Sequence, residues 1–179
     1  MKTAQLVPFA PPPPEPPAAY AISVTLMKSN EEISAEFQLL GDTTSIRWPQ
    51  PVAQAQPGHE LWKHTCFELF RAQPNSPEYW EYNFSPSRQW AIYAFKDYRQ
   101  AAPLSVTNTP IIELPQLSDT AFTLQVRFNL EPPLHNKSLI IGVSAVIETI
   151  DDQRHYYALK HCSDKPDFHL RESFILEID

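Results

Sequence analysis

Residues 61–95 read LWKHTCFELFRAQPNSPEYWEYNFSPSRQWAIYAF, and this stretch decides the fold. It contains three β-type runs, 61–71, 79–85 and 89–95, which are rich in aromatic and branched side chains. Two turn segments separate them, QPNSP at 73–77 and SPSR at 85–88. The stretch therefore predicts two successive antiparallel hairpins.

Successive side chains of a strand point to opposite faces, so the three runs divide into two sets. We expect one face to form the core, because its residues are nearly all apolar: Thr65, Phe67, Leu69, Trp80, Tyr82, Phe84, Trp90, Ile92 and Ala94. The other face mixes polar groups with rings, and it includes Trp62, His64, Cys66, Glu68, Phe70, Tyr79, Glu81, Asn83, Tyr93 and Phe95. Polar groups among aromatic rings are typical of a ligand-binding face.

In the expected register Glu68 lies opposite Glu81, and two facing carboxylates are unfavourable unless something neutralises them. The candidates are Arg127 from the run 121–130, His64, a bound metal ion or a shared proton. A buried pair between one acid and an arginine or histidine, which merely joins two layers, explains the pattern equally well.

The rest of the chain continues the β pattern, and no helical period extends beyond about two turns. Further strands are expected at 20–28, 33–40, 45–48, 105–114, 121–130, 138–148, 156–160 and 173–178. The 19 prolines argue against long helices, and the 3 isolated glycines provide no glycine-rich phosphate loop. We expect an all-β fold, a single-domain antiparallel β-sandwich over residues 20–179, preceded by a proline-rich arm over 1–19.

The charge and composition exclude several classes of partner. The net charge is -7 and no basic stripe is present, so we expect no nucleic-acid partner. No apolar run is long enough to span a membrane, and the N-terminus is too short and broken for a signal peptide, so we expect a cytoplasmic protein. The segment from Pro11 to Pro17 should form polyproline II, which either recruits a reader or lies along the domain or in solvent.

Three histidines, His155, His161 and His169, lie close together near the C-terminal end. His161 and His169 with Asp167 could hold a metal ion, although their spacing matches no closed zinc pattern. An aspartate in a Pro-Asp-Phe-His turn more often caps backbone N–H groups, which is the role we expect for Asp167.

Catalytic and haem functions each have a candidate residue. Cys66 follows His64 by two residues, but a cysteine inside a strand beside rings is usually an inert small hydrophobe. Glu68 and Glu81 could act as the paired acids of a glycosidase. Haem would need an axial pair, and only Met27 could face His161 or another histidine.

The segment LWKHTCFELF at 61–70 resembles the LW-(D/H)-(D/T)-x-x-E-x-F strand of the DOMON-like superfamily, which includes family 9 carbohydrate-binding modules. Residues 79–93 resemble its YxExNxSPxGxWxAY hairpin, and residues 165–176 resemble its closing PDFHxxxxFxxL strand. The resemblance extends from about Leu39 to Ile178 and is specific to small bacterial DOMON-like proteins.

The resemblance implies a sandwich of two antiparallel sheets, with a ligand site on or beside one sheet. Members bind sugars or haem and usually lack catalysis of their own. The sugar-binding modules stack a sugar between tryptophans and read its hydroxyls with charged and amide groups. By position, Trp62, Glu68, Glu81 and Asn83 correspond to that region. His64 and Thr65 stand where the sugar modules carry paired acids.

We therefore expect non-catalytic binding of a small polar ligand, with a sugar as the first candidate and no cofactor. The expected site contains Trp62, His64, Glu68, Glu81, Asn83 and Tyr93, with Arg127 as one candidate for the neutralising group and His161, Asp167 and His169 at the rim. The alternatives are a haem-binding DOMON domain and a structural or protein-interaction sandwich with no small ligand. The oligomeric state stays open.

Overall fold

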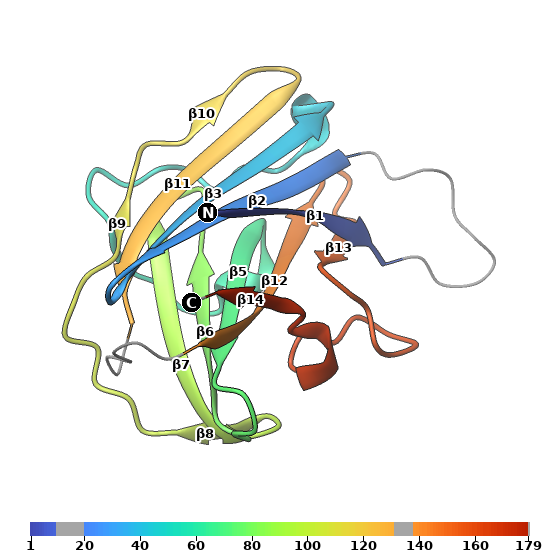
Figure 1. Cartoon of the computed structure of the whole chain (residues 1–179). Helices are drawn as coiled ribbons and strands as arrows, with labels where there is room; N and C mark the ends of the chain where they lie inside the picture. The colour runs from blue at the N-terminus through green and yellow to red at the C-terminus, as the bar shows by residue number, and fades with distance from the viewer. Residues whose placement is uncertain (10–19, 131–137, 179) are drawn as a thin grey trace.

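The computed structural model describes residues 1–9, 20–130 and 138–178, and its strands form two sheets packed face to face (Figure 1). The first sheet has the order β10-β11-β3-β2-β1, and the second has the order β13-β12-β5-β6-β7-β4. Three strands lie beside this path: β14 pairs with β12, β8 with β7 and β9 with β11. The strand bounds are β1 Lys2–Pro8, β2 Tyr20–Ser29, β3 Glu32–Gly41, β4 Gln56–Pro57, β5 Cys66–Ala72, β6 Tyr79–Phe84, β7 Gln89–Asp97, β8 Gln100–Ala102, β9 Ile111–Ile112, β10 Gln116–Leu117, β11 Ala121–Asn129, β12 Leu139–Glu148, β13 Arg154–Ala158 and β14 Leu176–Ile178.

The predicted antiparallel β-sandwich is confirmed, with one short parallel pair, β4 with β7, within the described part of the chain. The core lies between the sheets and is built by alternate residues of each strand. In the first sheet Ile22, Val24 and Leu26 are fully buried. In the second sheet the buried set contains most of the expected core face: Phe67, Leu69, Trp80, Tyr82, Phe84, Trp90 and Ala94. The division of the central strands into a core face and a mixed face is therefore correct.

One charged side chain belongs to this core face. Arg71 follows Phe67 and Leu69 on the inward side of β5 and is fully buried. Its guanidinium lies over the Trp80 ring, 3.8 Å from the ring centroid, and its Nε donates to the Tyr82 hydroxyl at 3.1 Å. The aromatic rings thus provide both a cation–π contact and a hydrogen-bond acceptor for a cation inside the sandwich.

Both predicted hairpins are present, because β5 pairs with β6 and β6 pairs with β7. The register of the first differs from the expected one by two residues: Glu68 lies opposite Asn83, and Glu81 lies opposite Phe70. The predicted facing pair of glutamates is therefore wrong. The cause is that β5 continues to Ala72, which pairs with Tyr79. A two-residue shift preserves the faces, so both carboxylates still lie on the outer face, at diagonal positions.

Short 3₁₀ helices occupy the beginning of two predicted strands. Leu61–Lys63 forms η2 after Glu60, whose φ of 50° is left-handed, so β5 begins only at Cys66. Thr43–Ser45 forms η1, and the expected strand at 45–48 is reduced to an isolated bridge between Ile46 and Thr149.

Two other predicted strands are shorter than expected. Within 105–114 only β9 forms, because Pro103, Pro110 and Pro115 cannot donate to a ladder. At the C-terminal end Arg171–Ser173 forms the 3₁₀ helix η3, and the expected strand at 173–178 is confined to β14. The short strands β4, β8 and β10 were not expected, because two or three residues give no alternation to recognise.

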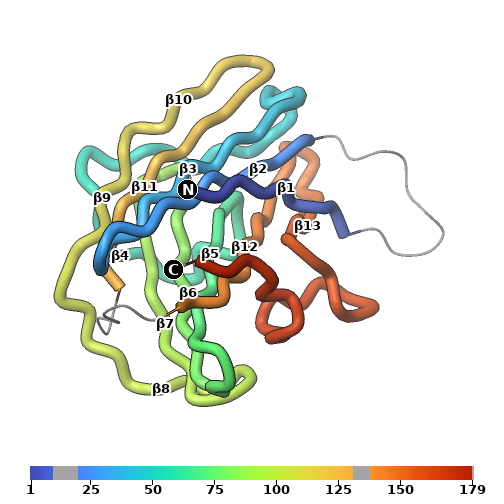
Figure 2. The backbone as a smooth tube through the Cα atoms, in the orientation of Figure 1, coloured from blue at the N-terminus to red at the C-terminus, as the bar shows by residue number. Residues whose placement is uncertain are grey.

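The first strand, β1, was also not expected, and it joins the two sheets. Residues from Lys2 to Leu6 pair with β2 in the first sheet, whereas Val7 and Pro8 pair with β13 in the second. Figure 2 follows this path, in which the N-terminal strand runs beside β2 and continues to β13. The strand thereby closes one side of the sandwich.

The expected polyproline segment from Pro11 to Pro17 lies outside the described residues. Within the described ranges, the helices are too short to cross a bilayer.

Candidate functional site

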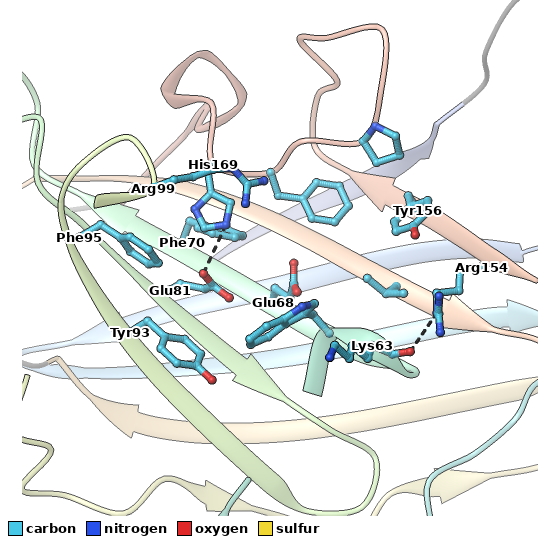
Figure 3. A pocket seen from close by; sticks show the side chains of 14 residues that line it. Lys63, Glu68, Phe70, Glu81, Tyr93, Phe95, Arg99, Arg154, Tyr156 and His169 are labelled. Atoms are coloured by element: carbon cyan, nitrogen blue, oxygen red, sulfur yellow. Dashed lines mark hydrogen bonds and ion pairs between the residues drawn. The ribbon is translucent and has the colours of Figure 1, made fainter. Parts of the chain in front are cut away.

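The outer face of the second sheet carries a pocket of about 430 Å³ (Figure 3). Strands β5 and β6 supply its floor, β7 and η2 one wall, and β13 with the chain that follows it the other. The lining residues are Trp62, Lys63, Glu68, Phe70, Glu81, Tyr93, Phe95, Arg99, Val146, Arg154, Tyr156, Pro166, Phe168 and His169. The mixed face that the sequence pattern identified is therefore hollowed and partly covered.

Two carboxyl groups lie on the floor of the pocket. Glu68 and Glu81 are only 3% and 5% exposed, because neighbouring strands and the covering chain enclose them. Glu68 Oε2 accepts a hydrogen bond from Ser144 Oγ at 2.7 Å. Glu81 Oε1 accepts one from Asn83 Nδ2 at 2.6 Å. Both acids are thus held in place by neutral donors.

Burial makes these carboxyls resist ionisation. It raises the pKa of Glu68 to about 8, and the charge of Glu81 adds to that rise. Burial also raises the pKa of Glu81, although the hydrogen bond from Asn83 and the charge of Arg99 oppose it. The buried carboxyl of Glu68 is therefore mostly protonated at neutral pH, so the two acids avoid a double negative charge.

Cys66 lies on the same face but is fully buried beneath the pocket. Its Sγ is 3.6 Å from Asn83 Oδ1. Burial, together with the charges of Glu68 and Glu81, raises the pKa of the thiol well above its ordinary value. A protonated, enclosed thiol is a poor nucleophile, which agrees with the inert role expected for it.

Arg99 brings a positive charge to the pocket, and the sequence did not indicate it. It lies in the turn after β7 with a left-handed φ of 52°. Its Nη2 donates to Asp167 Oδ1 at 3.0 Å, and Tyr98 Oη donates to Asp167 Oδ2 at 2.6 Å. This cluster attaches the C-terminal segment to the end of β7.

Asp167 has the capping role that was expected for it. Its Oδ1 accepts the backbone N–H of His169 at 3.1 Å, which is an Asx-type turn. Burial alone would raise the pKa of Asp167, but the hydrogen bonds from Tyr98, His169 and Arg99 outweigh it and lower the pKa. The ionised Asp167 therefore supports the rim of the pocket but does not line the pocket itself.

His169 lies above Glu81, with its Nε2 3.6 Å from Glu81 Oε2 (Figure 3). Burial and the charge of Arg99 lower the pKa of His169 to about 4, so the ring is neutral at pH 7 and this contact is not an ion pair. The Tyr79 hydroxyl accepts the backbone N–H of Arg99 at 3.0 Å and lies 2.8 Å from His169 Nδ1. If Tyr79 donates to Nδ1, the histidine proton is on Nε2 and points at the carboxyl; we assign this tautomer.

Aromatic side chains form much of the walls. Trp62 on η2 is 37% exposed, and its ring meets Tyr93 edge-on with centroids 5.8 Å apart. Burial raises the pKa of Tyr93, with a further contribution from Glu81. Phe70, Phe95, Tyr156 and Phe168 also line the pocket. A ligand here would meet ring faces and edges at the walls and carboxyls at the floor.

Two expected site residues on the mixed face do not line the pocket. Asn83 is fully buried, and it acts from beneath by bonding Glu81. His64 lies just beyond η2, where its Nδ1 bonds Glu148 Oε2 at 2.7 Å, so it does not neutralise Glu68 or Glu81. His64 and Asn83 therefore stay outside the lining of this pocket, and a direct contact of either with a ligand stays a prediction.

Arg127 and His161 are also outside the pocket. Arg127 is in β11 of the other sheet, where it forms an ion pair with Glu113 at 3.7 Å. The role expected for it beside the glutamates is wrong, because the side chain projects from the opposite side of the sandwich. His161 bonds the carbonyl oxygen of Val7 through Nε2 at 3.0 Å, and burial lowers its pKa. It joins the C-terminal segment to β1.

Met27, the only residue considered as a haem-ligating methionine, lies in β2 and is 50% exposed. It lines a second cavity of about 480 Å³ on the outer face of the first sheet, and no described histidine lines that cavity. The described part of the chain also contains no cluster of three or more histidine, cysteine or acidic side chains arranged to hold a metal ion.

The pocket thus brings together Trp62, Glu68, Glu81, Tyr93 and His169 from the expected set. Several lining residues were not in that set, and for some the sequence held a signal: Phe70 and Phe95 follow the same two-residue period as Glu68 and Tyr93. Arg99 and Phe168 had no such signal, since turns and irregular chain bring them to the pocket.

Comparison with known proteins gives similarity at the level of structure only. No protein-family model matches the sequence, and no curated protein matches it. A proposed carbohydrate-binding protein from Bacteroides uniformis superposes with a TM-score of 0.71 at 12% identity, over 97% of this chain and 84% of that one. A family 9 carbohydrate-binding module from Caldicellulosiruptor kristjanssonii superposes with TM-scores of 0.53 in its glucose complex and 0.57 in its cellotriose complex. The identities are 8% and 7%, and the matches cover 86% of this chain and 74% and 72% of the module. These likenesses establish that the chain shares the β-sandwich fold of these solved structures.

Proposed function

We propose that this protein binds a small carbohydrate without catalysis, in the pocket on the outer face of the second sheet, and that it is a DOMON-like protein. The sequence resemblance at 61–95 and 165–176 supports the relationship. The fold shared with family 9 carbohydrate-binding modules, and the sugars those modules bind, support the ligand class.

The observation that carries the proposal is the combination of aromatic walls with a carboxyl floor in one pocket. The C–H faces of a sugar ring pack against aromatic rings, and Trp62 and Tyr93 offer such surfaces at the rim. Sugar hydroxyls both donate and accept hydrogen bonds. Because the pKa of Glu68 is raised to about 8, a protonated carboxyl on the floor can donate as well as accept.

The pocket departs from the two-tryptophan arrangement that the resemblance implies. Of the four tryptophans, only Trp62 lines the pocket. Trp48 stacks on Phe122 with centroids 4.3 Å apart, and Trp80 and Trp90 belong to the core. In our proposal, Trp62 therefore supports the sugar from one side, and tyrosine and phenylalanine rings supply the rest of the walls.

Titration of the purified protein with neutral and amino mono- and disaccharides, followed by NMR and calorimetry, tests this proposal. Trp62→Ala should weaken binding of a retained sugar by about tenfold or more, because an exposed stacking surface is lost. Glu81→Gln should also weaken binding, since an amide N–H₂ then replaces one of the two floor oxygens that can accept from sugar hydroxyls.

Matched substitutions on the opposite sheet serve as controls. Leu117→Ala and Glu113→Gln change exposed side chains far from the pocket and should leave sugar affinity unchanged. The proposal fails if no sugar binds to the folded wild type, or if the control variants lose as much affinity as Trp62→Ala.

A further inference from the structure

We propose that the carbohydrate bound in this pocket carries an ammonium group, held between the carboxyls of Glu68 and Glu81, so that the preferred ligand is an amino sugar. The inference rests on the proposed function and specifies its ligand. Three features of the pocket support it: the two acids have neutral hydrogen-bond partners, the nearby cations are bonded to other groups, and the walls are aromatic.

The two floor acids lack a cationic partner of their own among the described residues. Glu68 is bonded by the neutral Ser144 and Glu81 by the neutral Asn83. The nearest ionisable donor is His169 at 3.6 Å from Glu81, and this ring is neutral because burial and Arg99 disfavour its charged form. Two carboxyls that are more than nine-tenths buried thus face a cavity, and no charged cationic side chain among the described residues is bonded to either of them.

The cations around the pocket are already engaged elsewhere. Arg99 is bonded to Asp167 at 3.0 Å, and Lys63 pairs with Glu60 on η2. Arg154 Nε donates to the carbonyl oxygen of Lys63 at 2.9 Å, at the rim (Figure 3). Arg99 does stabilise the ionised form of both floor acids through space. It makes no direct contact with either, so hydrogen-bonding positions on their oxygens remain open to a ligand.

An ammonium group can take these positions. It offers three donors, which suits carboxyl oxygens on two strands, and charge-assisted bonds of this kind are about twice as strong as neutral ones. The aromatic walls add to this preference, since ring faces attract cations. A bare divalent ion would need more oxygen or nitrogen ligands than these two acids supply, and the described residues contain no larger cluster.

The test compares three forms of each sugar: the neutral parent, the amino sugar and its N-acetyl derivative. Glucose, galactose and mannose with their 2-amino and 2-acetamido forms are titrated by calorimetry at about pH 6.5, where the amine is charged. We expect at least one amino sugar to bind about tenfold more tightly than both its parent and its N-acetyl form. The N-acetyl form keeps the substituent but removes the charge, so it separates charge from shape.

Glutamine variants locate the effect. Glu68→Gln imitates the protonated acid of the empty pocket and should fold. The wild-type carboxyl can lose its proton when an ammonium binds and an amide cannot, so the variant should reduce the preference for the amino form to less than about threefold. Glu113→Gln makes the same change on an exposed surface of the other sheet and should keep the full preference. Thermal unfolding of each variant shows whether it is folded.

The outcomes separate this inference from the proposed function. Equal or tighter binding of neutral sugars overturns the inference and leaves carbohydrate binding standing. Binding of simple amines but of no sugar overturns both carbohydrate binding and the amino-sugar ligand. If neither sugars nor amines bind, both are overturned as well. If Glu68→Gln keeps the full preference for the amino sugar, the inference alone is overturned and carbohydrate binding stands.

Discussion

At the scale of single residues, burial acts in opposite directions on two titratable groups that meet in the pocket. It raises the pKa of Glu68 to about 8 and lowers the pKa of His169 to about 4. Both effects have one cause, the loss of water around a group that could carry charge. Near neutral pH, Glu68 on the floor of the pocket and His169 above the floor are therefore both largely uncharged.

These shifts predict how stability depends on pH. Between its ordinary pKa of 4.5 and about 8, Glu68 is protonated in the folded chain and ionised in the unfolded chain, so stability falls as pH rises. Between about 4 and its ordinary pKa of 6.5, His169 is neutral when folded and protonated when unfolded, so stability falls as pH drops. From these two groups, we expect a plateau between about pH 4.5 and 6.5 and a loss on either side.

Urea denaturation at a series of pH values measures this dependence. Glu68→Gln should remove most of the alkaline fall, gaining on the order of 2 kcal/mol relative to the wild type between about pH 6.5 and 8. His169→Gln should remove the fall on the acid side. Parallel curves for the wild type and Glu68→Gln across the alkaline range would contradict the assignment.

At the scale of elements, the chain after β13 covers the pocket because Phe174 packs onto a glycine. A Cβ atom at Gly142 in β12 would lie 2.5 Å from Cδ1 of Phe174. The Phe174 ring also packs against Phe70 and Tyr79, with centroids 5.4 and 5.9 Å apart. The glycine thus makes room for the ring that holds η3 against the second sheet.

Gly142→Ala should therefore destabilise the protein by about 1–3 kcal/mol, because the added methyl group displaces Phe174. The displacement should also make the covering segment more sensitive to protease. Chemical denaturation and limited proteolysis measure the two effects.

The double variant Gly142→Ala with Phe174→Leu provides the control. A smaller side chain leaves space for the new methyl group, so the double variant should be more stable than the sum of the single losses predicts. Strict additivity would show that the glycine is not required for this contact.

Sequence patterns predicted the long elements well and the short ones poorly. Strands such as β2 and β12 show enough alternation to be recognised, and the apolar faces of β5, β6 and β7 determine which side is buried. The predicted register at Glu68 differed from the observed one by two residues, but this error kept every side chain on its correct face. The sequence therefore still identified the residues that form the floor of the pocket. The turn that carries Arg99 and the 3₁₀ helix that carries Trp62 have no periodicity, so their contributions depend on tertiary contacts.

At the scale of the whole molecule, β1 is the connection between the sheets. Leu6 is 5% exposed and belongs to the core, and the strand covers edges of both β2 and β13. Deletion of residues 2–8 should therefore lower stability by about 2–5 kcal/mol and expose two strand edges that favour self-association. Chemical denaturation and size-exclusion chromatography measure these effects.

Substitution of exposed β1 residues is the matched control for this deletion. Lys2→Ala and Thr3→Ala keep the backbone pairing of β1, so they should leave the protein monodisperse and nearly as stable as the wild type. A deletion variant with unchanged stability would show that β1 is dispensable.

The same strand has a kinetic consequence. Val7 pairs with Ala158, so two segments far apart along the sequence must meet before the sandwich closes. Contacts so distant along the chain slow folding, and domains dominated by them typically fold in milliseconds to seconds. On a ribosome, β1 can join β2 before β13 has been synthesised, so the pocket, one wall of which β13 supplies, can form only after the strands of the first sheet have emerged.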